Sequence, residues 1–233
     1  MNILAVDTAG KTAGVALLQD DRLLYEVYLD AGMTHSETLM PMIDTCLKMC
    51  GLTCADIDLY AVNAGPGSFT GLRIGLAAVK GLAFPRETLC APVSTLEALA
   101  AAHTGEGTVL CALDARRAQV YNAIFACKDG VLTRMTEDRA ISLVELQQDL
   151  LKIDKKIFLV GDGAALCYTT LSDRVPQLCL MPEHLRQQRA SGAALAAWEQ
   201  IQSGEGGDAA ALTPNYIRLS QAERARLEAN TTE

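Results

Sequence analysis

Three things that this sequence has little of exclude whole classes of protein. Lysine and arginine number 20 against 28 aspartates and glutamates, and the net charge of −8 argues against a protein that binds nucleic acid alone, since that task needs a basic face. No apolar run approaches the roughly 20 residues that a membrane helix requires. Aromatic residues make up only 5% of the 233 residues while half are hydrophobic, which predicts an ordered, largely aliphatic core.

Two further absences concern the cell compartment. The N-terminal segment MNILAVDTAG has neither the basic start nor the cleavage site of a signal peptide. The eight cysteines include no C-x-x-C pair of the kind that zinc and redox sites use. We therefore expect a cytoplasmic protein with buried, reduced thiols. Cys46, Cys50 and Cys54 are spaced like one helical face and its exit, and the role of this row stays open.

What is present is a regular alternation of strands and helices. Thr34 and Glu37 form the capping pattern that opens a helix, and Gly51 ends that helix. The same pattern opens helices at Ser94 and Ser142. Another helix is expected from the loop after residue 63 to about residue 84. The expected strands are 2–6, 13–18, 23–29, 57–63, 89–93 and 156–160.

The pattern of the first residues returns after about a hundred positions. The stretch 108–132 lies over 2–24 with Asp114 matching Asp7, and each copy reads strand, tight turn, strand, acidic turn, strand. Such a repeat is too long for a solenoid. We expect an α/β protein with two duplicated halves, each a mixed β-sheet flanked by helices. The boundary is placed at 1–104 and 105–233, and the charged end, 221–233, is expected to form a solvated helix.

Four motifs carry a family resemblance. The duplication with an aspartate in each first hairpin resembles the actin–Hsp70–hexokinase (ASKHA) superfamily. The segment AGPGSFTGLRIG, with the opening ILAVDT, the helix start HSETLMP and the late PNYIR, resembles the TsaB (YeaZ) family and its glycoprotease-like (M22) relatives. The resemblance implies a part in making N6-threonylcarbamoyladenosine in bacterial tRNA.

The resemblance also implies a role within that pathway. It is that of a non-catalytic scaffold and dimerisation subunit, which binds and activates the catalytic paralogue TsaD. An accessory ATPase (TsaE) is the other implied partner, and a homodimer is implied when the chain is alone. Direct tRNA binding by the isolated chain is not expected. Preference for a homodimer or a heterodimer stays open.

The glycine-rich loop Gly65–Gly75 raises the question of a phosphate site. A P-loop needs lysine directly after its last glycine, whereas Leu72 follows Gly71 here. At about 100° per residue, Gly71, Gly75, Ala78 and Leu82 share one face of the helix that follows. Small residues on one face allow another helix to approach closely, so we interpret these glycines as packing residues.

The preceding helix indicates what packs there. Its apolar residues cover roughly 180°, which is wider than the ~100° stripe of one core contact. In the resembling family the first helices form the dimer or partner surface, while the alternative is that both are sandwiched within their own domain. Which face is core and which is interface stays open. The implied interface residues are Leu39, Met40, Ile43, Cys46, Leu47, Gly71, Gly75, Ala78 and Leu82.

The matching stretch in TsaD carries two histidines, H-x-x-x-H, that bind a metal. Here His35 stands at the first position and Leu39 at the second, and one imidazole with no partner is a poor metal site. We expect neither a metal nor catalytic residues. A glycoprotease-like metallopeptidase, one alternative function, would need the H-E-x-x-H motif that the sequence lacks.

A degenerate nucleotide clamp is the remaining possibility for a ligand. Asp7, Thr8 and Gly10 resemble the superfamily's first phosphate hairpin, and Gly161 and Gly163 resemble its adenosine-side turn. The second hairpin, 114–117, has no glycine. We expect no required cofactor, with weak or partner-dependent ATP or ADP binding left open. The alternative is an autonomous ATP-dependent kinase-like enzyme or acyltransferase of the same superfamily.

Overall fold

The aliphatic strands of the first half form one five-stranded sheet with the order β3-β2-β1-β4-β5. In the computed structural model, which describes residues 1–103 and 105–218, β1, β2 and β3 form an antiparallel meander. Strands β4 and β5 join β1 in parallel, which makes the sheet mixed. The strands are β1 Asn2–Asp7, β2 Ala13–Gln19, β3 Arg22–Leu29, β4 Leu59–Gly65 and β5 Leu89–Ser94.

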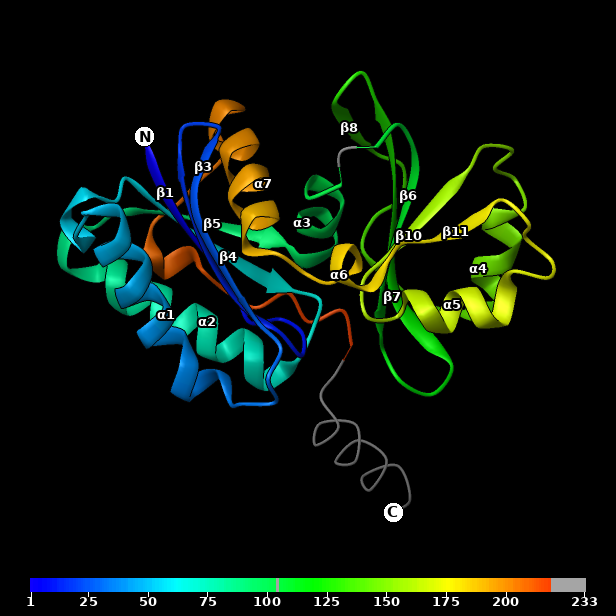
Figure 1. The fold of residues 1–233 in the computed structure, drawn as a ribbon, viewed down its shortest axis with the longest axis horizontal. Coiled ribbons are helices and arrows are strands. Elements are labelled where there is room, and N and C mark those ends of the chain that lie inside the picture. Colours follow the sequence, from blue (N-terminus) through cyan, green and yellow to red (C-terminus); the bar gives the residue numbers. More distant parts are fainter. Residues whose placement is uncertain (104, 219–233) are drawn as a thin grey trace, which may run out of the picture.

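Helices cover both faces of this first sheet (Figure 1). On one face lie α1 (His35–Cys50) and α2 (Phe69–Ala83), whose buried side chains share a core with Leu4 and Val6 of β1. The predicted end of α1 is confirmed, because Gly51 has a left-handed φ of 68° that glycine adopts without strain. Thr34 is the N-cap residue, and its hydroxyl donates to the Glu37 carboxylate at 2.5 Å.

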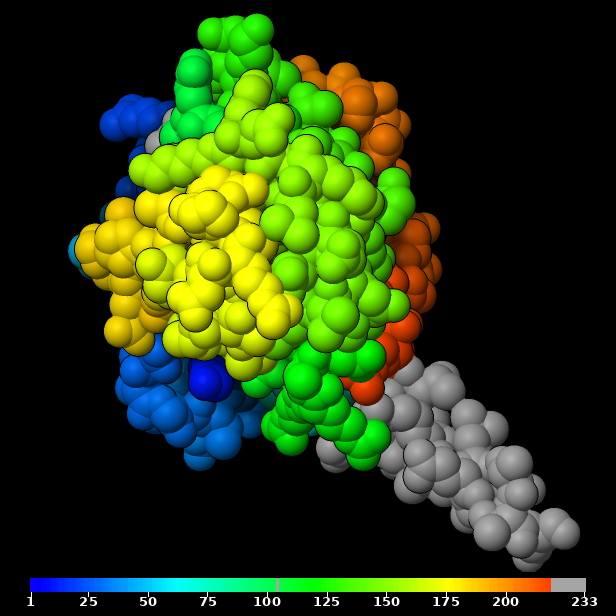
Figure 2. Space-filling model, turned by 90° about the vertical axis from the view of Figure 1, so that its right-hand side faces the viewer, coloured from blue at the N-terminus to red at the C-terminus, as the bar shows by residue number. Residues whose placement is uncertain are grey.

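The second sheet repeats the arrangement with the order β11-β10-β6-β7-β8, and β9 pairs with β7. One face is covered by α4 (Leu143–Leu150) and α5 (Ala164–Leu171), which form the outer side of this lobe in Figure 2. The other face packs against α3 (Thr95–Ala101). The strands are β6 Gly107–Asp114, β7 Gln119–Lys128, β8 Val131–Arg134, β9 Arg139–Ser142, β10 Ile157–Val160 and β11 Leu178–Leu180.

The fold class predicted from the repeat is confirmed, with two mixed sheets flanked by helices. The chain after residue 180 does not stay in the second lobe, however. After the short α6 (Glu183–Arg186), α7 (Ala190–Gln202) packs its small buried residues against the free face of the first sheet (Figure 1). Gly192 of α7 lies so close to the Ala98 carbonyl of α3 that no side chain fits there.

Residues 207–212, which follow α7, also belong to the first lobe. Gly207 forms a bridge with Cys90 at the edge of β5, and Leu212 is buried in the core beneath α1 and α2. The expected boundary at residue 105 therefore separates the two sheets, while 190–212 return to the first lobe. The expected charged helix, 221–233, lies outside the described residues. In the described part of the chain, no helix is long and apolar enough to cross a membrane.

Candidate functional site

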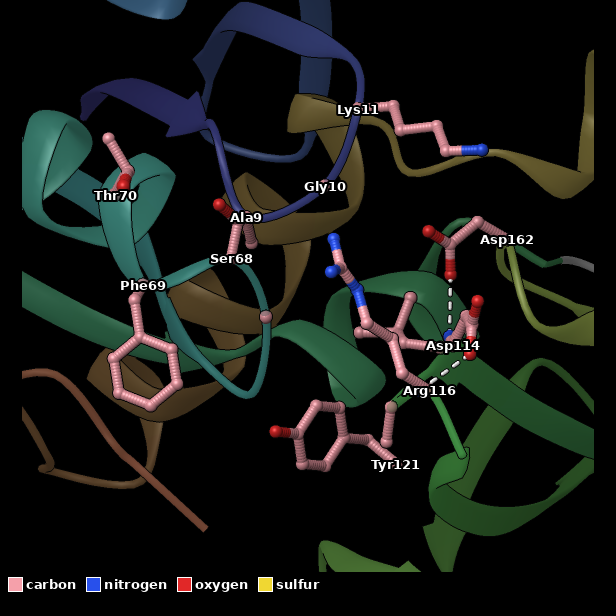
Figure 3. Close-up of a pocket in the computed structure, with 13 residues that line it drawn as sticks. Ala9, Gly10, Lys11, Ser68, Phe69, Thr70, Asp114, Arg116, Tyr121 and Asp162 are labelled. Atoms are coloured by element: carbon pink, nitrogen blue, oxygen red, sulfur yellow. Dashed lines mark hydrogen bonds between the residues drawn. The ribbon is translucent and has the colours of Figure 1, made fainter. Parts of the chain in front are cut away.

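The two lobes face each other across a cleft of about 540 Å³. Figure 3 shows Arg116 extending from the second lobe toward the turn at Ala9 and Gly10 in the first. The lining residues come from the first hairpin, the start of α2, the second hairpin and two neighbouring positions. They are Ala9, Gly10, Lys11, Gly67, Ser68, Phe69, Thr70, Leu113, Asp114, Ala115, Arg116, Tyr121 and Asp162.

The first hairpin, which joins β1 to β2, turns its acidic residue away from the cleft. Asp7 is only 2% exposed, its Oδ1 accepts the Ala9 N–H at 2.9 Å, and burial raises the pKa of its carboxyl. Thr8 is buried as well and its hydroxyl donates to the Gly71 carbonyl at 2.8 Å. Of the three nucleotide residues predicted in this hairpin, Gly10 alone lines the cleft. The side chain of Gln188 fills the space where a Cβ of Gly10 would stand.

The second hairpin, residues 115–118 between β6 and β7, has an unusual backbone. Arg116, Arg117 and Ala118 have φ angles of 62°, 57° and 54°, a left-handed conformation that non-glycine residues rarely adopt. The Asp114 carboxylate accepts the Arg116 N–H at 2.7 Å and so closes the turn. This conformation carries the Arg116 side chain into the cleft. The sequence shows no glycine in this hairpin, and an arginine side chain lines the cleft at this point.

Asp162, a cleft residue that was not predicted from the sequence, lies beside this hairpin. Its Oδ1 accepts the Asp114 N–H at 2.9 Å, and burial raises the pKa of its carboxyl. Gly161 and Gly163 on either side do not line the cleft, because they pack against the backbone of β6 at Ala112 and Leu113. Both glycines allow the turn between β10 and α5 to lie close against β6. The position of Asp162 in a strand-to-helix turn was the sequence signal that could have identified it.

The charges of the cleft come from both lobes. Lys11 and Arg116 contribute cations from opposite lobes, and neither forms an ion pair with an acidic side chain among the described residues. Asp114 and Asp162 lie on the same wall as Arg116. An anionic group between the lobes would meet both cations, so the cleft suits binding of an anion better than acid–base chemistry.

His35, the one histidine of the sequence motif, is used within the chain. It is the first residue of α1, and its Nε2 lies 3.0 Å from the Gly10 carbonyl oxygen. Leu39, one turn later, is only 1% exposed. Among the described residues, no three His, Cys, Asp or Glu side chains are grouped as a metal site requires.

The glycines of the loop pack inside their own lobe, which corrects our interpretation of them as an approach for another helix. A Cβ at Gly65 would collide with the Asn215 carbonyl, and one at Gly67 with the Ala9 carbonyl. At Gly71 it would collide with the Thr8 carbonyl, and at Gly75 it would lie 2.5 Å from Thr8 Oγ1. The helical wheel grouped Gly71 and Gly75 correctly, but the face they share lies against the first hairpin.

The other predicted interface residues divide in the same way. Leu39, Ile43, Cys46 and Leu47 of α1 are at most 7% exposed and belong to the first-lobe core. Met40 is 47% exposed, and Ala78 and Leu82 are partly buried at the edge of that core. Most of the predicted interface residues therefore lie in the first-lobe core and not on the surface of α1 and α2.

A different set of residues on α2, which was not predicted from the sequence, does face outward. Arg73, Ala77 and Gly81 are exposed at successive turns of α2, and a Cβ added at Gly81 would meet nothing within 4 Å. The stripe continues to Phe84, which is 81% exposed. We call Arg73, Ala77, Gly81 and Phe84 the α2 stripe.

Five of the eight cysteines are buried, and Cys50, Cys54 and Cys179 are half-buried. None of the eight, all within the described residues, forms a disulfide. Burial raises the pKa of Cys46 to about 12 and that of Cys90 to about 11, which keeps both protonated at neutral pH.

Comparison of the chain with known proteins gives one consistent family. The family model of TsaD, tRNA N6-adenosine threonylcarbamoyltransferase, matches residues 29–226. The tRNA threonylcarbamoyladenosine biosynthesis protein TsaB of Bacillus subtilis is 31% identical over 98% of this chain and 99% of its own length. The protein with the same description from Escherichia coli is 34% identical over 70% of this chain and 72% of its own.

Solved structures agree on the fold. YeaZ from Pseudomonas aeruginosa superposes with a TM-score of 0.75 at 28% identity, covering 92% of this chain and 99% of that one. The ROK hexokinase of Thermus thermophilus superposes with a TM-score of 0.50 at 12% identity, over 88% of this chain and 100% of its own. The second likeness is one of fold alone.

Proposed function

The chain belongs to the TsaB (YeaZ) family of tRNA threonylcarbamoyladenosine biosynthesis proteins, and from this premise we propose that it is a non-catalytic scaffold subunit. Its partner is the catalytic paralogue TsaD, which it binds and activates in bacterial synthesis of N6-threonylcarbamoyladenosine in tRNA. The observation that carries this proposal is the α2 stripe, a flat and partly apolar surface beside α1.

The α2 stripe suits a helix of another protein. Ala77 and Gly81 project almost nothing from the helix, so a second helix can approach to about 8 Å between axes. Phe84 and Met49, 81% and 71% exposed, supply large apolar groups near the end of the two helices. Exposed large apolar side chains on neighbouring helices are typical of protein–protein contacts. Ala78 and Leu82 of the original interface set adjoin the stripe on α2, and Met40 of that set is exposed on α1.

Two features support a role without catalysis. Asp7, the carboxylate of the first hairpin, is buried below the cleft floor and its pKa is raised, so it is poorly placed to hold a nucleotide's metal. The second hairpin offers Arg116 in place of the glycine that lets backbone N–H groups reach phosphates. Autonomous hydrolysis of ATP would require both parts.

The cleft nonetheless favours a second, weaker binding activity. Lys11 and Arg116 from opposite lobes and the hydroxyls of Ser68 and Thr70 surround a volume suited to a nucleotide. We propose that ATP or ADP binds there weakly or only with the partner present, and that no cofactor is required. The accessory ATPase TsaE is then the expected source of ATP turnover in the complex. The site of action is the cytoplasm, where tRNA is modified.

The same face serves a homodimer when TsaD is absent. One apolar surface cannot contact two partners at once, so TsaD and a second copy of this chain compete for it. The test is co-expression with the paralogue from the same genome, followed by size-exclusion chromatography. A shift from a homodimer to a mixed complex is expected, whereas separate elution of the two proteins would refute the proposal.

A further inference from the structure

The chain crosses between the lobes a third time near its end, by a segment that no role described above uses. Residues 213–218 leave the first-lobe core at Leu212 and reach the second hairpin. The Asn215 N–H donates to the Ala64 carbonyl at 2.7 Å, and Arg218 Nη1 donates to the Ala115 carbonyl at 2.9 Å. In Figure 1 this red-orange segment ends between the two lobes. We call it the tether.

The middle of the tether is fixed to the start of α2. The Tyr216 ring stacks on Phe69, with centroids 4.5 Å apart and planes 24° from parallel. Its hydroxyl accepts a hydrogen bond from Arg73 Nε at 2.9 Å. Phe69 lines the cleft, and Arg73 begins the α2 stripe. Tyr216 therefore contacts both the cleft wall and the proposed partner surface.

The end of the tether holds a backbone that is unfavourable by itself. The three left-handed residues of the second hairpin need surrounding contacts to persist. Backbone hydrogen bonds from the Ala115 N–H to the Gln119 carbonyl and from the Gln119 N–H to the Arg116 carbonyl close the hairpin, and the Leu143 N–H donates to the Ala118 carbonyl at 3.4 Å. Two side-chain contacts join these at its base: the Asp114 carboxylate on the Arg116 N–H and the Arg218 guanidinium on the Ala115 carbonyl. The first lies within the hairpin, whereas the second comes from 103 residues away.

We propose that the tether holds the second hairpin in its cleft-facing conformation and connects it, through Tyr216 and Arg73, to the partner surface on α2. The hairpin carries Arg116, so the tether keeps the Arg116 side chain facing the cleft. The part of this inference that concerns the partner rests on the proposed function, whereas the part that concerns the hairpin does not.

The first test measures hydrogen exchange by mass spectrometry in the isolated chain. Arg218→Ala removes the bond to Ala115, and the amides of 115–119 are expected to exchange about tenfold faster. Peptides of α5 are expected to be unchanged, and Arg218→Lys, which keeps a charged donor, restores much of the protection. Arg174→Ala, at an exposed arginine whose contact is to Gln147, is the matched control.

The outcome decides the hairpin part in either direction. Unchanged exchange at 115–119 in Arg218→Ala would overturn the inference. So would equal acceleration in 115–119 and in α5, because the variant would then destabilise the whole chain rather than the hairpin.

The second test adds TsaD. In the parent, complex formation is expected to slow exchange at 115–119, and Tyr216→Phe, which keeps the stacked ring but removes the acceptor for Arg73, is expected to lose this slowing while still binding. A complex that leaves 115–119 unchanged in the parent would refute the connection through Tyr216. Failure to form any complex would refute the proposed function and leave the isolated-chain result standing.

Discussion

The hydroxyl of Thr8 in the first hairpin donates to the carbonyl of Gly71 in the first turn of α2, at 2.8 Å. This bond joins the two motifs that most resemble phosphate-binding elements, and it does so inside the protein. The glycines at 67, 71 and 75 allow the contact, since a side chain at any of them would displace the hairpin. The glycine-rich loop is therefore a packing platform that fixes α2 against the sheet.

The first prediction separates inward from outward glycines of α2. Gly75→Ala places a Cβ 2.5 Å from Thr8 Oγ1, and such overpacking is expected to lower the free energy of unfolding by about 1–3 kcal/mol. Gly81→Ala meets open space and is expected to raise it by about 0.5–1 kcal/mol, the helix propensity difference. Urea denaturation measures both. Similar effects of the two substitutions would contradict the assignment of faces.

The second prediction concerns the α2 stripe. Ala77→Glu places a carboxylate where the partner helix is proposed to lie, and burying it unpaired costs about 3 kcal/mol or more. The dissociation constant for TsaD is expected to rise about a hundredfold, since ~1.4 kcal/mol is a factor of ten. Val144→Glu, at a 72% exposed site on α4, is the control. Calorimetry that shows equal affinities for both variants would place the interface elsewhere.

The third prediction is a pH dependence at Asp7. Burial raises the pKa of this carboxyl above 3.8, so the folded state binds its proton more tightly than the unfolded state. As pH rises from 3.8 through the folded-state pKa, ionisation of Asp7 therefore lowers the free energy of unfolding. Asp7→Asn keeps an oxygen for the Ala9 N–H and removes this cost. The variant is therefore expected to gain stability relative to the parent as pH rises above 3.8. A difference in unfolding free energy that does not change with pH would contradict the raised pKa.

The fourth prediction is that purified protein contains no stoichiometric zinc or iron. It rests on His35, whose Nε2 faces the Gly10 carbonyl, and on Leu39, which is buried where a second ligand would be needed. Elemental analysis of protein prepared without chelators is the measurement. About one metal per chain that disappears in His35→Ala would show the prediction to be wrong.

Local pattern was enough for much of the fold. The helix ends at Thr34 and Gly51 were predicted from capping chemistry, and the repeat that aligns Asp114 with Asp7 predicted both sheets. A wheel, however, states which residues share a face and not what lies against it, so the face of Gly75 was misassigned. The contact partner, Thr8, is more than sixty residues away and could not be inferred from spacing.

The same limit applies to the cleft and to the end of the chain. Arg116 lines the cleft because of a left-handed backbone, and arginine carries no signal for that conformation. The return of α7 to the first sheet depends on small residues around Gly192, whose partner Ala98 belongs to a distant helix. Arg218 reaches Ala115 in the same way. Each of these contacts joins segments about a hundred residues apart, which periodicity cannot pair.

The most direct test of the scaffold proposal is transfer of the threonylcarbamoyl group to tRNA by purified proteins. TsaD is assayed with TsaE, ATP, threonylcarbamoyl-adenylate and unmodified tRNA, with and without this chain, and the modified nucleoside is measured. The isolated chain is expected to form no product, addition of the chain to TsaD is expected to raise or enable modification, and Ala77→Glu is expected to lose that effect while Val144→Glu keeps it. Product formed by this chain alone, or modification by TsaD that is indifferent to it, would contradict the account.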